Sequence, residues 1–352
     1  MAVDASYVLG LHKELKETYS GFHEKITRIE GIRQQSYKIE IPETYKETTQ
    51  AAYTPYVGDI VRRVVAILCA GYPTLRVEPQ TGSEESQRKA NAKERWTYAA
   101  LLQLERQGGG IWSKLIDSAV AYGMGVSKFL YRPDVWRGAG KRREGEEDEE
   151  YLERIDTEKR GLRLPFDWST LDPRSFFPYF DSDGLAEVVQ VSQRPLYRVV
   201  KQYGKEAEEF VARHPSLPPD VGQGYNCTFY EYWSRDEVLY IMEADGGTQE
   251  LKGWRHGYGR VPYFICKGLE TSNEDPRYAT ESIVEHVLES IVILERLNTM
   301  KLTYATLTNW PMGYRVRPEG AVPTEGESEK PVKFRAGEFL EVDSEPKFLT
   351  AP

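Results

Sequence analysis

ATESIVEHVLESIVILERLNTMKLTYATLTNWP, residues 279–311, has the pattern of one long α-helix. Ser282 followed three residues later by Glu285 fits a capping box, in which two side chains satisfy the free amides at a helix N-terminus. Helical periodicity continues to Thr308, and Pro311 ends it because proline cannot continue a helix. At about 1.5 Å per residue, roughly 27 residues span ~40 Å. We therefore predict a single rod from Ser282 to Thr308.

Two faces of this predicted helix differ in chemistry. Apolar side chains recur at helical spacing and form one broad stripe: Ile283, Val284, Val287, Leu288, Ile291, Leu294 and Leu297. An acidic line with four-residue spacing lies on another face: Glu281, Glu285 and Glu289. Arg296 and Lys301 follow further along the helix. We expect the apolar stripe to pack against other elements and the acidic line to face solvent or another subunit.

The rest of the chain mixes helices and strands without regular alternation. Helical patterns occupy residues 7–19, 26–37, 56–69, 83–107, 111–123 and 195–214. Strand patterns occupy residues 126–132, 185–193, 226–233, 237–243, 249–254, 261–266, 314–317 and 332–342. The four strands between 226 and 266 are separated by short turns and read as one meander. Because strands follow one another instead of alternating with helices, we predict an α+β fold.

Residues 141–150, KRREGEEDEE, are nearly all charged: nine of the ten side chains carry a charge. Such a run is too costly to bury, so we expect a solvated hairpin tip or a mobile loop between two strands. The alternative is a docking arm for a partner.

Composition narrows the class of protein. The 352 residues include 55 acidic and 46 basic side chains, a net charge of −9, and 40% are hydrophobic, which is typical of a globular protein of two or three domains. Charged residues interrupt the most apolar stretch, 57–70, so we predict no membrane span. The first residues lack the pattern of a secretory signal, and synthesis in the cytoplasm is expected.

Catalytic motifs are not apparent. The five histidines lack metal-ligand spacing, and the three cysteines form no CxxC pair. His286 and Glu289 lie three residues apart on the long helix, but a di-metal bundle needs such pairs on several facing helices. The glycines of 123–128 lack the Gly-Lys pair of a phosphate loop. We therefore predict no metal, no cofactor and no enzyme.

Four stretches in this order resemble the portal proteins of tailed bacteriophages. They are TPYVGDIVRRVVAILCAGYPTLRVEP at 54–79, LDPRSFFPYFDSDG at 171–184, the meander from FYEYW to GRVPYFICKG, and ATESIVEHVLESIVILERLNTMKLTYATLTNWPMGYRV at 279–316. None is a strict signature, so the resemblance rests on their order and spacing.

The resemblance implies a ring of twelve subunits at one capsid vertex of the virion, assembled in the bacterial cytoplasm, through which double-stranded DNA passes without sequence specificity. Residues 1–278 would form the wing, 279–308 the first stem helix, and 309–352 the start of the clip. The implied partners are the terminase large subunit, head-tail adaptor, major capsid and scaffolding proteins. In such a ring, the DNA-facing residues would be Glu281, Glu285, Glu289, Arg296 and Lys301. A basic region would serve the motor or another partner: Arg315, Arg317, Lys330, Lys333 and Arg335.

One departure from the family is large. Portal proteins continue into a second stem helix and usually a crown, which this sequence lacks after Val342, so we expect a truncated chain. Two other functions remain open at this point: a head-tail adaptor or capsid protein without a channel, and a metal-dependent phage nuclease.

Overall fold

The computed structural model describes residues 3–43, 46, 49–71, 74–132, 135, 142, 145–161, 163–214, 225–273, 278–309, 313–316 and 339–342. The chain forms two compact units, one of residues 1–27 with 61–283 and one of residues 28–60 with 284–352. Helices and strands are mixed along the chain without regular alternation, and the strands of the first unit pair antiparallel, which confirms the α+β class. The sequence assigned residues 28–60 to the wing, whereas the structure groups them with the long helix near the C-terminus.

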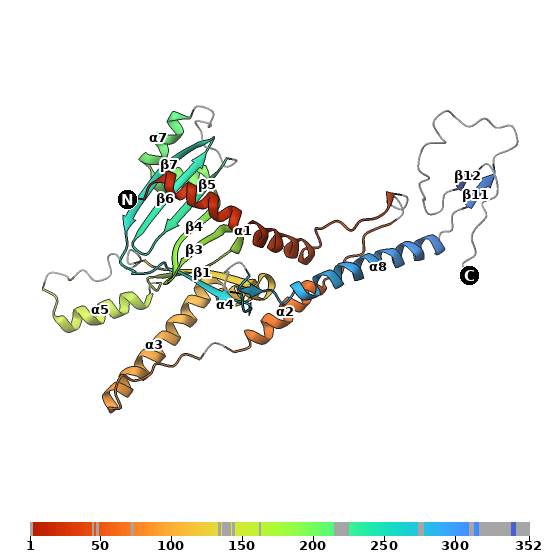
Figure 1. Ribbon diagram of the computed structural model, residues 1–352. Coiled ribbons are helices and arrows are strands. Elements are labelled where there is room, and N and C mark those ends of the chain that lie inside the picture. The colour runs from red at the N-terminus through yellow and green to blue at the C-terminus, as the bar shows by residue number, and fades with distance from the viewer. Residues whose placement is uncertain are drawn as a thin grey trace. The chain divides into compact units, whose positions relative to one another are not determined.

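A five-stranded antiparallel sheet forms the centre of the first unit (Figure 1). Its strands are β3 (Phe176–Asp181), β4 (Gly184–Pro195), β5 (Asn226–Trp233), β6 (Glu237–Ala244) and β7 (Gly247–Arg255), paired in that order. Pairing of each strand with the next along the chain confirms three strands of the predicted meander.

The fourth predicted meander strand belongs to a different sheet. It is β8 (Tyr263–Lys267), which pairs with β1 (Met124–Tyr131), and β1 also pairs with β2 (Phe166–Leu171). Val261 and Tyr263 are buried in a cluster with Val126 and Trp233, and this burial holds β8 beside β1 instead of at the edge of the meander. The prediction of a four-stranded meander was therefore wrong in its last strand.

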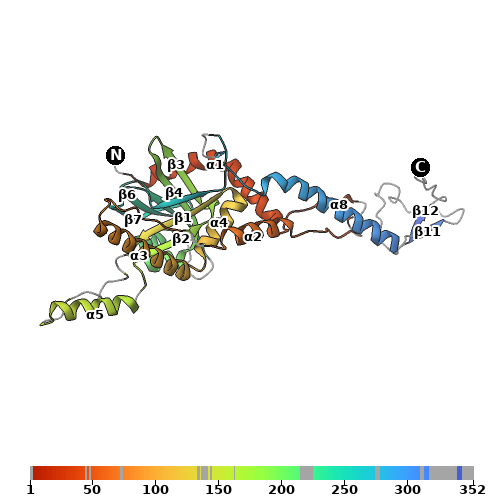
Figure 2. The ribbon, with the colours of Figure 1, turned by 90° about the horizontal axis from the view of Figure 1, so that it is seen from below.

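Helices cover these sheets. α1 (Ala5–Arg33) is one helix where the sequence predicted two, and its apolar residues Val8, Leu15 and Tyr19 pack on the five-stranded sheet (Figure 1). α3 (Glu84–Gly108) starts at the predicted cap, where the Ser83 hydroxyl accepts a hydrogen bond from the Ser86 amide. α4 (Ile111–Tyr122) lies directly against β1 (Figure 2).

The helix predicted over 195–214 is two helices, α6 (Leu196–Tyr203) and α7 (Lys205–Arg213). They meet at Gly204, whose φ of +59° lies in a region that other residues rarely adopt. α2 (Tyr56–Leu68) agrees with its prediction over 56–69 to within a residue.

The charged run at 141–150 lies between the paired strands β1 and β2, as predicted, but it is not entirely loop. Helix α5 (Asp148–Gly161) begins inside it. Glutamate, lysine, arginine and leucine are good helix formers, and three acidic residues in the first turn suit the positive end of the helix dipole. The expectation of an unstructured loop is corrected for residues 148–150.

The second unit is built around α8 (Glu285–Asn309), a 25-residue helix that is unbroken in both views (Figures 1 and 2). This helix begins at Glu285, whereas the sequence predicted a start at the Ser282 cap. The Ser282 hydroxyl donates to the carbonyl oxygens of Val120 and Ala121, at 3.2 and 2.6 Å, and the helix starts three residues later. Beyond α8, β11 (Gly313–Val316) and β12 (Phe339–Val342) pair in parallel.

Glu281 is not on the long helix. It lies in the short strand β10 (Thr280–Glu281), which pairs with β9 (Leu269–Glu270) in the first unit. The predicted acidic line of three glutamates is therefore reduced to two on α8.

Candidate functional site

Helix α8 carries one buried face, and that face includes a carboxylate. Four of its residues at helical spacing are buried, namely Leu288, Ile291, Glu295 and Thr299, and Val284, one residue before the helix, is buried as well. Glu295 is completely inaccessible to solvent, although glutamate is among the residues least often buried without partners. The side chains that surround it belong to the segment we call the strap, residues 36–43 and 49–55.

Glu295 accepts hydrogen bonds from both parts of the strap. One carboxylate oxygen accepts from the amide and the hydroxyl of Thr54, at 2.7 and 2.8 Å, and the other accepts from the Tyr37 hydroxyl. Burial, together with the hydrogen bond to the Glu295 carboxylate, raises the pKa of Tyr37. One turn further along α8, the Thr299 hydroxyl accepts from the Ala52 amide at 3.0 Å. The strap is thus fastened to α8 by polar contacts that are partly shielded from water.

The opposite face of α8 is apolar and exposed. Ile293, Leu297, Met300 and Tyr304 follow one another at spacings of four, three and four residues, and between 49% and 74% of each is exposed. We call these four residues the α8 stripe. This spacing places apolar side chains on one narrow line and is the spacing of a coiled-coil seam. The predicted apolar stripe was only partly correct, because Val287, Leu294 and Leu297 are exposed whereas Val284, Leu288 and Ile291 are buried.

A shallow hollow of about 250 Å³ lies between the strap and α8. Ile39, Ile41 and Pro42 of the strap form one wall, and Met300 and Tyr304 of the stripe form part of the other. The exposed stripe therefore continues into an apolar groove beside it.

Two of the charged residues predicted to face DNA are ion-paired. Glu289 pairs with Arg28, and Arg296 pairs with Glu40 at 3.4 Å, so each has a partner of opposite charge within the second unit. Glu285 is half-buried and Lys301 is exposed.

Arg315 lies in β11, where the structure describes only the backbone. The other predicted docking residues, Arg317, Lys330, Lys333 and Arg335, lie outside the described residues.

A buried charge cluster joins the three-stranded and the five-stranded sheet of the first unit. Lys128 on β1 donates to Glu231 on β5, and Arg194 on β4 donates to the other oxygen of the same carboxylate. The Lys128 ammonium lies 4.8 Å from the centre of the Trp233 ring. Burial lowers the pKa of Lys128, and the adjacent Glu231 carboxylate opposes that shift. With its partners in place, the cluster is a cross-link between sheets and not a reactive group.

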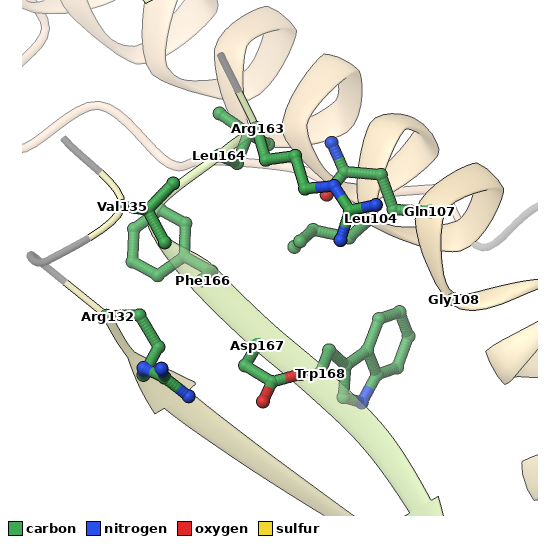
Figure 3. Close-up of a pocket in the computed structure, with 10 residues that line it drawn as sticks. All are labelled: Leu104, Gln107, Gly108, Arg132, Val135, Arg163, Leu164, Phe166, Asp167 and Trp168. Atoms are coloured by element: carbon green, nitrogen blue, oxygen red, sulfur yellow. The ribbon is translucent and has the colours of Figure 1, made fainter.

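A polar pocket of the first unit lies between the end of α3 and the β1–β2 pair (Figure 3), and its volume is about 270 Å³. Arg132 and Arg163 enter it from two sides, and Asp167 and Trp168 line its floor. Of the described residues that line this pocket, none is a histidine, cysteine or serine.

Over the part of the chain that the structure describes, no group of three or more His, Cys, Asp or Glu is placed to hold a metal ion. Within that same part, no helix has the length and apolar character needed to cross a bilayer.

Sequence reasoning missed Glu295 and the strap. The sequence does contain a pattern that predicts burial of Glu295. This residue follows Leu288 by seven positions and Ile291 by four, so it falls on the same helix face as these apolar side chains. No known family model matches the chain, and no curated protein matches it.

Proposed function

We propose that this chain is a portal protein of tailed bacteriophages, which forms a ring at one capsid vertex and gives passage to double-stranded DNA. The observation that carries the proposal is α8, a continuous helix with an exposed apolar stripe opposite its buried face. The order of the four quoted sequence stretches supports the same proposal. The chain acts in the virion as a conduit and assembly hub, without catalysis.

The exposed apolar side chains of the stripe would be stabilised by burial against another protein surface, and a second copy of the chain can supply that surface. Removing a large apolar side chain from water is worth about 1.5–3 kcal/mol when burial is complete. Met300 and Tyr304 border both the stripe and the groove, whereas Ile39, Ile41 and Pro42 of the strap form the far wall of the groove, so the two surfaces face partly different directions around the helix. A neighbour can therefore place one face of its α8 against a different face of the next, which is the head-to-tail contact that closes into a ring.

Balanced charge on α8 suits a surface along which DNA slides. Each phosphate held by Lys or Arg must be released before the duplex advances, so strong attraction would raise the barrier to movement. The pairing of Glu289 with Arg28 and of Arg296 with Glu40 leaves little net charge at either position. Such a wall neither binds nor strongly repels the duplex.

Electron microscopy of the purified protein tests the ring. We expect annular particles with a central hole near the width of a DNA duplex. Changing Leu297 and Met300 together to Glu places charge on the stripe and should abolish the rings, whereas the conservative pair Leu297→Met and Met300→Leu should preserve them. Circular dichroism checks that both variants keep their helices. A monomeric wild-type protein contradicts the proposal, and rings without a hole indicate an adaptor or capsid protein.

A packaging assay tests the conduit. Changing Glu285 and Glu289 to Lys should leave rings intact but slow DNA packaging, and the effect should depend more strongly on salt than in the wild type. Arg28→Glu is the matched control, because it breaks the same ion pair without adding positive charge to α8. Equal packaging by all three proteins would remove these residues from the channel wall.

A further inference from the structure

The first unit contains an open apolar groove that has no part in the channel described above. It has a volume of about 500 Å³ and lies between α3, α4 and the three-stranded sheet. Its walls are aromatic, with Trp96 from α3, Trp112 from α4, Phe166 and Trp168 from β2, and Phe264 from β8. Trp96 and Phe264 are 60% and 43% exposed. Large aromatic side chains that stay this accessible are typical of surfaces that bind another protein.

Positive charge marks the rim of this groove. Arg260 lines it, with its guanidinium 5.3 Å from the centre of the Phe264 ring. Lys93 lies one turn before Trp96 and Thr97 on α3 and is exposed on the side of the helix that faces the groove. The occupant of the groove should therefore combine an apolar ridge with acidic residues.

Helix α5 has that chemistry. Leu152 is 63% exposed, and Ile155 follows it on the same side of the helix. Its first turn is acidic, with Asp148, Glu149 and Glu150, and Glu153 follows. Ion pairs of Arg154 with Glu146 and Glu158 stabilise the helix and connect it to the preceding residues. α5 is thus an ordered acidic helix whose apolar residue Leu152 lies in solvent.

We propose that α5 of one copy docks in the aromatic groove of the adjacent copy, with Leu152 among the aromatic rings and the acidic first turn beside Lys93 and Arg260. The inference rests on the proposed function in that it needs copies held side by side. It adds a second contact between copies that is independent of α8. Such a contact would fix the position of one first unit against the next while leaving the surface of α8 unchanged.

Photo-crosslinking tests this docking in the full chain. A benzoylphenylalanine at position 152 should join copies into dimers and larger species on a denaturing gel, and peptide mapping should place the new bond in residues 96–104 or 260–264. The matched control carries the same group at position 150, on the opposite side of α5, and should not label the groove. A monomer-sized product would mean that α5 binds its own groove, and labelling elsewhere or none would also overturn the proposal.

Charge exchange adds a second readout. The pair Lys93→Glu and Arg260→Glu should lower the crosslinked fraction, because it places like charges beside the acidic first turn of α5. Exposed ion pairs are individually weak, so we expect a decrease of roughly 5- to 10-fold. Adding Asp148→Lys and Glu149→Lys should restore crosslinking, and failure to restore it would contradict the proposed orientation. Electron microscopy separates the two hypotheses: rings without labelled grooves overturn the docking alone, whereas crosslinked copies without rings overturn the portal function.

Discussion

The buried carboxylate of Glu295 should hold the strap onto α8, and Glu295→Ala tests this. The substitution deprives three donors of their acceptor, namely the Tyr37 hydroxyl and the amide and hydroxyl of Thr54. Each buried donor without a partner lowers the stability of the folded state by about 1–3 kcal/mol. These three donors have partial access to water, so we assign each of them about 1 kcal/mol, the lower end of that range. The strap should therefore open about 3 kcal/mol more easily, which is a roughly hundredfold increase in its open fraction.

Hydrogen exchange followed by mass spectrometry measures that opening directly. Peptides that cover residues 49–55 should exchange roughly two orders of magnitude faster in Glu295→Ala. Glu295→Gln keeps one acceptor oxygen and should lose about 1 kcal/mol. Glu289→Ala, which breaks only the exposed pair with Arg28, should change the strap by at most about 0.5 kcal/mol. Equal exchange in Glu295→Ala and Glu289→Ala would refute the role assigned to the buried carboxylate.

Three further predictions concern the first unit. Burial against aromatic rings lowers the pKa of both His12 and His23 below 6.5. As the pH drops through about 6.5, the unfolded chain therefore takes up protons before the folded chain does, and the melting temperature should fall. Changing both histidines to Gln should weaken this dependence of the melting temperature on pH, and an unaltered dependence would contradict the prediction. Lys128→Met leaves the Glu231 carboxylate without its buried partner, and the free energy of unfolding measured in urea should fall by about 3–5 kcal/mol. The fall should be smaller when Glu231→Gln is added to the same chain. Equal falls in the single and the double variant would exclude the cross-link. Gly125→Ala would place a Cβ 2.4 Å from a backbone oxygen of α4 and should lower stability by about 1–3 kcal/mol, and an unchanged melting temperature would show that α4 shifts freely.

Local signals in the sequence located most helices and strands. The Ser83 hydroxyl caps α3, and Gly109 ends it with a φ of +64°, as their residue types indicate. The turn residues between 233 and 247 likewise mark the ends of β5, β6 and β7. These features depend on residues within a few positions of each other, so one sequence is enough to identify them.

Contacts between distant residues account for the errors. α8 starts three residues after Ser282, whose hydroxyl donates to carbonyl oxygens more than 160 positions away. The partner of β8 is set by burial of Tyr263 with Trp233, which no local pattern contains. Helix α5 is different, because its helix-forming composition was visible and its charge was given too much weight.

The candidate site was predicted in outline and not in its chemistry. The rod was found because 25 residues of helical periodicity are a strong signal. Its division into a strap-covered face and an exposed stripe depends on the strap, whose Ala52 and Thr54 are more than 240 positions away from their partners on α8. The resemblance to portal proteins placed Glu289 and Arg296 on a channel wall, which stays a prediction, and their ion pairs with Arg28 and Glu40 were not predicted.

The length of the α8 stripe limits what can cover it. From Ile293 to Tyr304 it runs for three helical turns, or ~16 Å along one narrow line. A helix that crosses α8 at a steep angle would touch only the middle of that line, whereas one inclined by about 20° follows it throughout. A cover of matching length is therefore a nearly aligned helix, and α8 of another copy is such a helix. If the Leu297→Glu and Met300→Glu pair broke the rings but Ile293→Glu and Tyr304→Glu did not, the partner would instead cross steeply, and a stem of aligned helices would be excluded.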